Sequence, residues 1–395
     1  MPTHRQLFLS HVAQTSEFPL MLEIEKAEGV YMSDIHGKKY LDLISGIGVS
    51  NIGHRHPKVL TAIQDQLDRY MHLMVYGEFV QSPQVKLASA LTKTLGEHLD
   101  NVYFVNSGSE AVEGALKLAK RYTGRPEIIS FSDAYHGSSH GALSVSGNEQ
   151  LKNKFRPLVP GNRILKFGEQ GDLKCIGHNT AAVIVEPVQG EAGVRIADRE
   201  YFAALRAACN ANGSLLIFDE IQCGFGRTGK FWAHEHYGVT PDILVCAKGM
   251  GGGMPIGSFI SSKEIMHLLT HDPVLGHITT FGGHPVSCAA SLATLEVIIE
   301  ENLLERAEEK GALFESLLKH QEIKDFRRLG LIMAVEFSSF EFLQKILSNL
   351  LDLGVLSDWF LFCDNSMRIA PPLTITTDEI KMACELIHQA IEKSK

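Results

Sequence analysis

The amino-acid sequence predicts an α/β protein, with a mostly parallel central sheet in a large domain and a smaller α+β domain. Short, continuous apolar runs alternate with longer segments of helical periodicity, as in parallel sheets that helices cover on both faces. The chain of 395 residues is also too long for one ordinary domain. We therefore expect a large domain at residues 57–285 and a small domain at residues 286–395. Residues 1–56 are expected to be part of the small domain.

The expected elements follow this alternation in order. Residues 21–45 alternate short apolar runs with turn residues and predict a small antiparallel meander, after which Pro57 opens a helix. Apolar or β-branched runs then predict strands at residues 102–105, 128–131, 181–185, 215–218 and 243–245. Helical periodicity lies between them at residues 109–122 and 199–212. Residues 288–318 have the pattern of one long amphipathic helix, followed by mixed elements.

Composition narrows the class of protein. Hydrophobic residues make up 45% of the chain and charged residues 21%, which is typical of a soluble globular protein. The net charge of −9 leaves no basic excess to neutralise phosphates, so we expect no nucleic-acid partner. No apolar run has the length of a signal peptide core or a membrane span. Scattered cysteines without a CxxC pair indicate reduced thiols, and together these features predict a cytoplasmic protein.

Small residues after the strand at 102–105 could bind an anion. Ser107, Gly108 and Ser109 precede a predicted helix, where backbone N–H groups can approach a negative charge and the helix N-terminus attracts it. The same pattern also fits an ordinary helix N-cap. This segment by itself leaves both interpretations open.

Asp219 and Lys248 each follow an apolar strand. An isolated carboxylate is costly in an apolar setting, so Asp219 is expected to be either paired or functional. Lys248 precedes several glycines, and desolvation there would favour the neutral amine that forms a Schiff base. The alternatives are a structural ion pair for Asp219 and a solvated loop position for Lys248. A nucleotide-binding loop is disfavoured, because neither GxxxxGK[ST] nor GxGxxG occurs at this position.

Aromatic and histidine residues add one more candidate. Tyr135-His136-Gly137 ends a predicted strand and loop, where the aromatic ring could stack on a flat cofactor or pack in the core. Several histidines have i,i+4 spacing, including the pair His136 and His140, but no HExxH motif occurs. We therefore expect no metal.

Taken in order, these segments resemble the class III aminotransferases, which are fold-type I enzymes dependent on pyridoxal 5′-phosphate (PLP). The resemblance runs over nearly the whole chain. It rests on SGSEA (107–111), YHG (135–137), EPVQGEAG (186–193), DEIQCGFGRTG (219–229), AKGMGGG (247–253), TTFGGHP (279–285) and RIAPP (368–372). The α/β fold that it implies is the PLP-dependent transferase fold type I.

The resemblance implies a role for each matched residue. Lys248 would hold PLP as a Schiff base and move the proton, and Asp219 would pair with the pyridine nitrogen. Gln222 would approach the ring hydroxyl and Tyr135 would stack on the ring. The phosphate would be held by Ser107, Gly108 and Ser109, joined by Thr280 from the partner subunit. His136 is a further implied cofactor-binding residue, and Glu186 would support the site. The role of Thr280 implies a homodimer with shared active sites.

Four positions bear on the substrate. Glu191 and Arg368 match the family's switch pair, in which the Glu covers the Arg until the carboxylate of a 2-oxo acid replaces it. Ile47 stands where ornithine δ-aminotransferases carry Tyr, which disfavours that substrate. Ser138 is a departure, because acetylornithine, ornithine and 4-aminobutyrate enzymes usually have there an Arg that binds a substrate carboxylate, and a hydroxyl does not replace it. Either the donor lacks that carboxylate, as a diamine such as putrescine does, or another cation binds it.

The sequence therefore predicts an aminotransferase that moves a terminal amino group to a 2-oxo acid, expected to be 2-oxoglutarate, by a ping-pong mechanism. The donor would be of the acetylornithine, 4-aminobutyrate or diamine type. Alternatives with the same fold are an aminomutase, a decarboxylase or a protein without catalysis, and a nucleotide-binding oxidoreductase is the alternative from another class. We expect a cytoplasmic homodimer that acts on small molecules and has no membrane partner.

Overall fold

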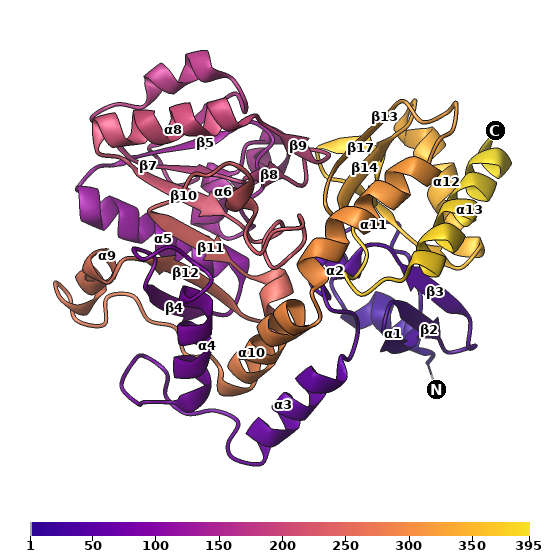
Figure 1. Cartoon of the computed structure of the whole chain (residues 1–395), viewed down its shortest axis with the longest axis horizontal. Helices are drawn as coiled ribbons and strands as arrows, with labels where there is room; N and C mark the ends of the chain where they lie inside the picture. The colour runs from indigo at the N-terminus through magenta and orange to yellow at the C-terminus, as the bar shows by residue number, and fades with distance from the viewer. Residues whose placement is uncertain (1) are drawn as a thin grey trace.

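A computed structural model describes residues 2–395 and contains a seven-stranded sheet in one half of the molecule (Figure 1). Its strand order is β4 (Asn101–Val105), β12 (Gly257–Ser261), β11 (Ile243–Cys246), β10 (Leu215–Asp219), β7 (Thr180–Val185), β5 (Glu127–Phe131) and β6 (Asn162–Leu165). Strand β12 runs antiparallel to both of its neighbours, whereas the other neighbouring strands run parallel. The predicted α/β class with a mostly parallel sheet is confirmed.

Burial on both faces explains why the central strands are apolar throughout. In β10, Ile217 packs in the same cluster as the apolar residues of α5 (Gly108–Thr123). Leu216 and Phe218 point the other way and pack with α8 (Arg199–Asn212). Successive side chains of a strand point to opposite faces, so a strand covered on both sides needs an unbroken apolar run.

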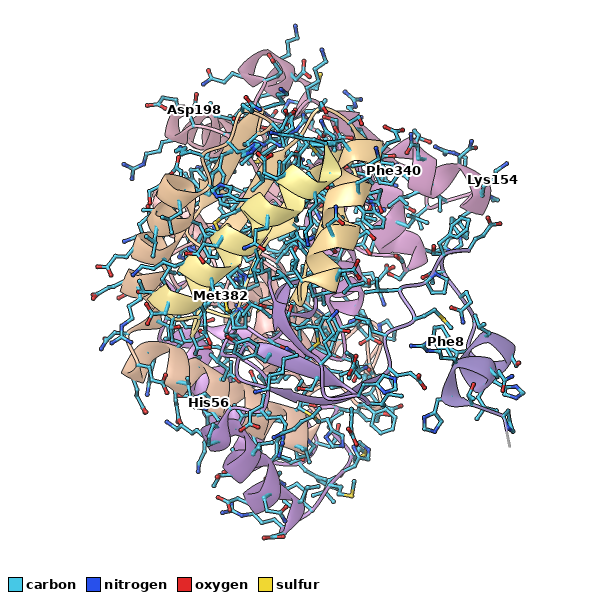
Figure 2. All side chains as sticks on the ribbon, turned by 90° about the vertical axis from the view of Figure 1, so that its right-hand side faces the viewer. Phe8, His56, Lys154, Asp198, Phe340 and Met382 are labelled. Atoms are coloured by element: carbon cyan, nitrogen blue, oxygen red, sulfur yellow. The ribbon has the colours of Figure 1, made fainter. Side chains whose placement is uncertain are left out.

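The predicted N-terminal meander is present as β1 (Ile24–Glu28), β2 (Tyr31–Asp34) and β3 (Lys39–Asp42), which pair in antiparallel fashion. Strand β15 (Val355–Leu356) pairs in parallel with β3 and so joins this segment to the C-terminal part of the chain. The preceding helix α1 (His4–His11) has no buried residue. Figure 2 shows α1, with Phe8, at the edge of the molecule.

A second, antiparallel sheet lies in the other half of the molecule. Its order is β13 (Asp325–Leu329), β14 (Ile332–Glu336), β17 (Cys363–Ile369) and β16 (Asp358–Phe360). Helix α13 (Thr377–Ser394) packs against both α11 (Leu303–Leu317) and α12 (Phe340–Asp352). Figure 2 places α12 and α13 side by side, with Phe340 and Met382 labelled.

Two features of the chain differ from the sequence prediction. Residues 288–318 form two helices, α10 (Pro285–Glu300) and α11, instead of one. The break falls at Asn302, whose left-handed backbone (φ 52°) interrupts the helix and is tolerated by Asn better than by most residues. Strands β6 and β12 are not predicted because their sequences, NRIL and GSFIS, each have only two apolar residues.

Shorter elements complete the chain. They are α2 (Ser45–Gly48), α3 (Pro57–Leu67), α4 (Ser82–Thr92), α6 (His140–Val145), α7 (Glu149–Lys152), α9 (Lys263–His267), β8 (Val188–Gln189), β9 (Arg195–Ile196) and 3₁₀ turns at Asn153–Phe155, Gln170–Cys175, Ala233–His236, Lys248–Gly251 and Leu268–Thr270. Helix α10 packs on α3 and α4. The domain boundaries near residues 57 and 286 stay a prediction. No helix within residues 2–395 is both long and apolar enough to cross a bilayer.

The buried guanidinium of Arg227 links segments that are far apart in the sequence. Its Nη1 donates to the carbonyl oxygens of Leu331 at 3.1 Å and Pro371 at 2.5 Å. Its Nη2 donates to Oδ1 of Asn51 at 2.5 Å. These bonds tie the N-terminal segment to the second sheet and to the chain that follows β17.

We predict that Arg227→Met lowers the free energy of unfolding by about 3 kcal/mol or more, because three buried acceptors lose their donor. Arg306→Met is the matched control, since Arg306 is exposed on α11, and it should change stability by less than about 0.5 kcal/mol. Urea unfolding of both variants measures the difference. Equal stability of the two variants would show that Arg227 does not hold these segments together.

Candidate active site

A cavity of about 420 Å³ lies at the carboxyl ends of the parallel strands, where loops from β5, β7, β10 and β11 meet. Ligands of open α/β sheets bind at this edge. The predicted residues that line the cavity are Ser107, Gly108, Ser109, Tyr135, His136, Glu186, Glu191, Asp219, Gln222 and Lys248. The fold thus brings together most of the residues that the motifs single out.

One wall of the cavity is suited to an anion. Ser107 is the N-cap of α5 and accepts a hydrogen bond from the backbone N–H of Glu110 at 3.2 Å. The N-cap interpretation is therefore correct, but the same residues also line the cavity at a helix N-terminus. A Cβ atom at Gly108 would lie 2.8 Å from Ile221, so only glycine fits there without a shift of that side chain.

Asp219 is paired with a histidine at the end of β10. Its Oδ2 lies 2.7 Å from Nδ1 of His136, and both side chains are buried. Its Oδ1 accepts a hydrogen bond from the backbone N–H of Ile221 at 3.1 Å. Nε2 of His136 is buried and has no hydrogen-bond partner within residues 2–395. The pair places an oriented carboxylate at the cavity wall.

Lys248 follows β11 and begins a 3₁₀ turn with a left-handed backbone (φ 45°). Burial lowers the pKa of its amine, although Glu191 opposes the shift. A larger fraction of neutral amine follows, and the neutral form is the nucleophile. Next to it, a Cβ atom at Gly249 would overlap the side-chain amide of Asn51, so the turn packs closely against the N-terminal segment.

Glu186 lines the same cavity and forms no ion pair with any residue of 2–395. Its two oxygens accept hydrogen bonds from the backbone N–H groups of Tyr135 at 2.9 Å and Gly190 at 3.2 Å. Burial, and then the nearby Asp219 carboxylate, raise the pKa of Glu186 well above its ordinary value. Glu186 therefore connects two loops of the site, and its environment favours the neutral acid.

Glu191 and Arg368 form a buried bidentate ion pair. Nη1 and Nη2 of Arg368 donate to the two carboxylate oxygens at 2.8 and 2.9 Å. Burial would raise the pKa of Glu191, but Arg368 outweighs it and holds this pKa at about 2. Gln222 donates a further hydrogen bond to Oε1 of Glu191 at 3.0 Å. The pair is therefore fully charged throughout the neutral pH range.

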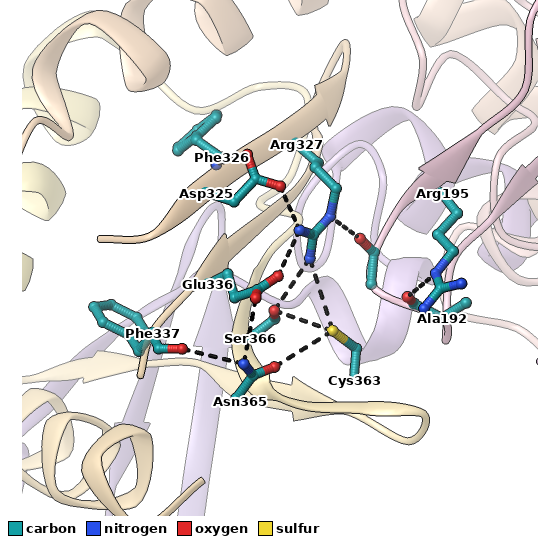
Figure 3. A network of polar contacts seen from close by, with 11 residues as sticks. Ala192, Arg195, Asp325, Phe326, Arg327, Glu336, Phe337, Cys363, Asn365 and Ser366 are labelled. Carbon is teal, nitrogen blue, oxygen red and sulfur yellow. Dashed lines mark hydrogen bonds and ion pairs between the residues drawn. The ribbon is translucent and has the colours of Figure 1, made fainter. Parts of the chain in front are cut away.

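Hydrogen bonds to backbone atoms fix the loop that carries Glu191, and Figure 3 shows Arg327 beside the part of this loop that contains Ala192. Nε of Arg327, on β13, donates to the carbonyl oxygen of Gly193 at 2.8 Å, and its Nη1 donates to Glu336 at 2.6 Å. The backbone N–H of Phe362 donates to the carbonyl oxygen of Glu191 at 3.0 Å. Phe362 thus holds the main chain of Glu191, and Arg327 holds the same loop two residues further on, both independently of the Glu191 carboxylate.

The predicted residues Ile47, Ser138 and Thr280 do not line the cavity. Ile47 is half-buried in a left-handed turn (φ 63°), and Val49 of the same segment lines the wall instead. Ser138 is exposed, with its Oγ 3.2 Å from the hydroxyl of Tyr135. Thr280 is also exposed. Sequence reasoning missed the wall residues Val49, Asn106, Ile221, Met254, Pro255 and Ile256, most of which are apolar and carry no chemical signature.

Comparison with known proteins identifies the family. Residues 12–391 match the family described as aminotransferase class-III, so the chain belongs to it. It is 39% identical to the acetylornithine aminotransferase of Methanocaldococcus jannaschii, over 98% of this chain and 96% of the relative. It is also 39% identical to that of Bacillus subtilis, over 94% and 95%. The crystal structure of Toxoplasma gondii ornithine aminotransferase superposes with a TM-score of 0.92 at 31% identity, over 100% of this chain and 96% of that one.

The chain is thus a PLP-dependent aminotransferase, and this excludes the nucleotide-binding alternative. The residues present fit the cofactor. Hydroxyl groups and a helix N-terminus suit the phosphate, and the buried carboxylate of Asp219 suits a pyridinium nitrogen. Oε1 of Gln222, at the cavity wall, is buried without a hydrogen-bond partner in the described part of the chain, which leaves an acceptor for the ring hydroxyl. Within residues 2–395, no group of three His, Cys, Asp or Glu side chains is arranged to hold a metal ion.

We predict that Gly137→Ala weakens PLP binding by about tenfold or more. Gly137 has a φ of 126°, and a Cβ atom there would overlap Oγ of Ser109 on the anion-binding wall. The control is Gly124→Ala, since Gly124 also has a positive φ (68°) but faces open space at the end of α5. Absorbance titration of the apoenzyme with PLP measures both. An unchanged dissociation constant in Gly137→Ala would contradict the assignment of this wall.

Proposed function

We propose that this aminotransferase takes the terminal amino group of a small amine and delivers it to 2-oxoglutarate in a ping-pong cycle. PLP, when bound, supplies a conjugated ring that accepts electrons from the carbon bearing the amino group. In this proposal Lys248 holds the cofactor covalently and carries the proton to and from the substrate carbon. Its support is the position of Lys248 in the cavity wall, where burial lowers the pKa of the amine.

Asp219 and His136 would keep the ring nitrogen protonated. A carboxylate held by an imidazole at 2.7 Å has one orientation, so its charge is presented to one point of the cavity. Tyr135 lines the same cavity and could cover a face of the ring. The hydroxyls of Ser107 and Ser109 would bind the phosphate.

Glu191 and Arg368 would give one site two specificities. While Glu191 covers Arg368, the site presents no free guanidinium, which suits an amine. When Glu191 moves aside, the guanidinium can bind the carboxylate of the 2-oxo acid in a bidentate manner. This proposal is supported by the bidentate geometry of the pair and by the separate anchoring of the Glu191 main chain.

A diamine such as putrescine is the donor that the charges of the site favour. The cavity wall contains Glu191 and Asp219, as well as Glu186, whose environment favours the neutral acid, and Lys248 is the only Lys or Arg in the wall among the residues described. With Ser138 in place of an arginine, position 138 supplies no guanidinium to a carboxylate at the far end of the donor. Glu191 could instead accept a hydrogen bond from the second ammonium group of a diamine.

N-acetylornithine is the second candidate donor. It is favoured by the relatives at 39% identity, which are named acetylornithine aminotransferases. For this donor, a cation other than residue 138 would have to bind the carboxylate. The two candidates therefore differ in whether the enzyme needs a positive charge at the far end of the donor.

We also propose a homodimer in the cytoplasm. Large apolar side chains are exposed around Thr280 and on two other segments, and burial against a second copy would remove them from water. They are Leu7, Leu9, Met71, Leu73, Met74, Phe79, Val80, Val274, Leu275, Ile278 and Phe281. Such an interface would place Thr280 near the partner's cavity. The seven free cysteines support a reducing compartment.

We predict that the wild-type enzyme has a higher kcat/KM for putrescine than for N-acetylornithine, with 2-oxoglutarate as acceptor. Ser138→Arg should reverse this order, since an added guanidinium repels a diamine and binds a carboxylate. The shift should be about tenfold or more in the ratio of the two kcat/KM values. His140→Arg adds the same charge at an exposed position two residues away and serves as the control.

A wild-type enzyme that prefers N-acetylornithine by about a hundredfold would contradict the diamine proposal. That result would support the second candidate and leave the aminotransferase assignment in place. No turnover of either donor, or of 4-aminobutyrate, lysine or ornithine, would contradict the proposed transfer of a terminal amino group.

A further inference from the structure

Arg368 has a second carboxylate partner that the proposed exchange does not use. Nε of Arg368 donates to Oδ1 of Asp358 at 2.9 Å. The two residues face each other across strands β16 and β17. Neither Asp358 nor Arg368 lines the cavity while Glu191 covers the guanidinium. Asp358 bonds Nε and leaves the Nη1–Nη2 edge, which Glu191 occupies, to the exchange.

The hairpin formed by β16 and β17 contacts the guanidinium of Arg368 at Nε and on one face of its plane. Asp358 takes Nε, and the carbonyl oxygen of Trp359 accepts from Nη2 at 3.2 Å. The ring of Phe360 lies under the guanidinium carbon at 4.5 Å. Glu191 occupies the remaining edge, formed by Nη1 and Nη2. Removal of the Glu191 carboxylate would therefore free one edge and leave the hairpin contacts intact.

We propose that Asp358 is a positioning residue, which keeps Arg368 aligned while Glu191 is displaced, so that the Nη1–Nη2 edge binds the carboxylate of the 2-oxo acid. The inference rests on the proposed exchange of Glu191 for that carboxylate. It assigns to the switch a third member that stays in place during the exchange.

A permanent counter-charge is needed because Arg368 is only 4% exposed. An arginine at this depth that lost its only anion would be an unpaired buried charge, which is strongly unfavourable. Asp358 would keep the guanidinium paired during the exchange and would also fix its direction. Orientation matters, since small displacements of a binding group reduce its effect on reaction rates severely.

The ionisation of Asp358 supports the same role at neutral pH. Burial, with smaller contributions from Glu191 and Asp42, raises the pKa of Asp358 to about 6 against the opposing effect of Arg368. Asp42 is itself bonded to His54 at 2.8 Å. Asp358 is therefore anionic above about pH 6 and becomes neutral below it, so the charged bond to Nε is lost as the pH falls through 6.

The test compares Asp358→Ala, Asp358→Asn and the control Asp364→Ala, which removes an exposed acid from β17. Asp358→Ala should raise the KM for 2-oxoglutarate by about tenfold or more, while the KM for the amine donor stays within about twofold. Asp358→Asn keeps an acceptor for Nε but lacks the charge, so its KM for 2-oxoglutarate at pH 8 should lie between those of the wild type and Asp358→Ala. It should also remove the rise in this KM that the wild type shows below pH 6.

Binding of glutarate to the holoenzyme, measured by calorimetry, decides the role of Asp358 without any amine donor. Asp358→Ala should weaken glutarate binding by about tenfold, and Asp364→Ala should leave it unchanged. Equal glutarate affinity in Asp358→Ala and wild type, or no glutarate binding by the wild type, would overturn the proposal. So would equal rises in the KM for amine and 2-oxo acid, which indicate a merely structural role. If no amine donor were turned over, that result would instead count against the proposed function.

Discussion

The ion pair between Glu191 and Arg368 is the interaction on which the site depends most. It joins a loop next to the large sheet to the central part of the second sheet, and it does so in a buried position where an unpaired charge is unfavourable. The same ion pair therefore connects the two sheets and determines which charge the cavity presents. An enzyme that must accept an amine and then a 2-oxo acid can change the charge it presents by moving one side chain, without rebuilding the fold.

The other ionisable groups of the cavity are distinguished by their partners. Asp219 has an imidazole, Glu191 has a guanidinium, and Glu186 has only backbone N–H groups, so three acids in one cavity have three different environments. Different surroundings give neighbouring carboxyl groups different pKa values, and similar side chains can therefore have different roles in one site. Lys248 lies among them with its pKa lowered by burial, which suits an amine that must be neutral to react.

Sequence reasoning predicted the parallel strands β5, β7, β10 and β11, because continuous apolar runs such as 215–218 have few other interpretations, but it missed the parallel strand β6. It also located the cavity, since Asp219 and Lys248 follow such strands and parallel strands end at one edge. It did not predict β12, whose glycine and serine residues hide an antiparallel strand, or the break at Asn302, which depends on one backbone angle. Asp358 could not be identified either, because its partner lies across a hairpin and no motif contains it.

The central claim is that Lys248 is the residue that holds PLP, as its position at the end of β11 and its burial among the acids of the cavity indicate. Reduction of the purified holoenzyme with borohydride, followed by peptide mass spectrometry, tests this claim most directly. The account predicts one pyridoxyl group per chain, on the peptide that contains Lys248. A pyridoxyl group on any other lysine, or a reduced holoenzyme without a modified peptide, would contradict it.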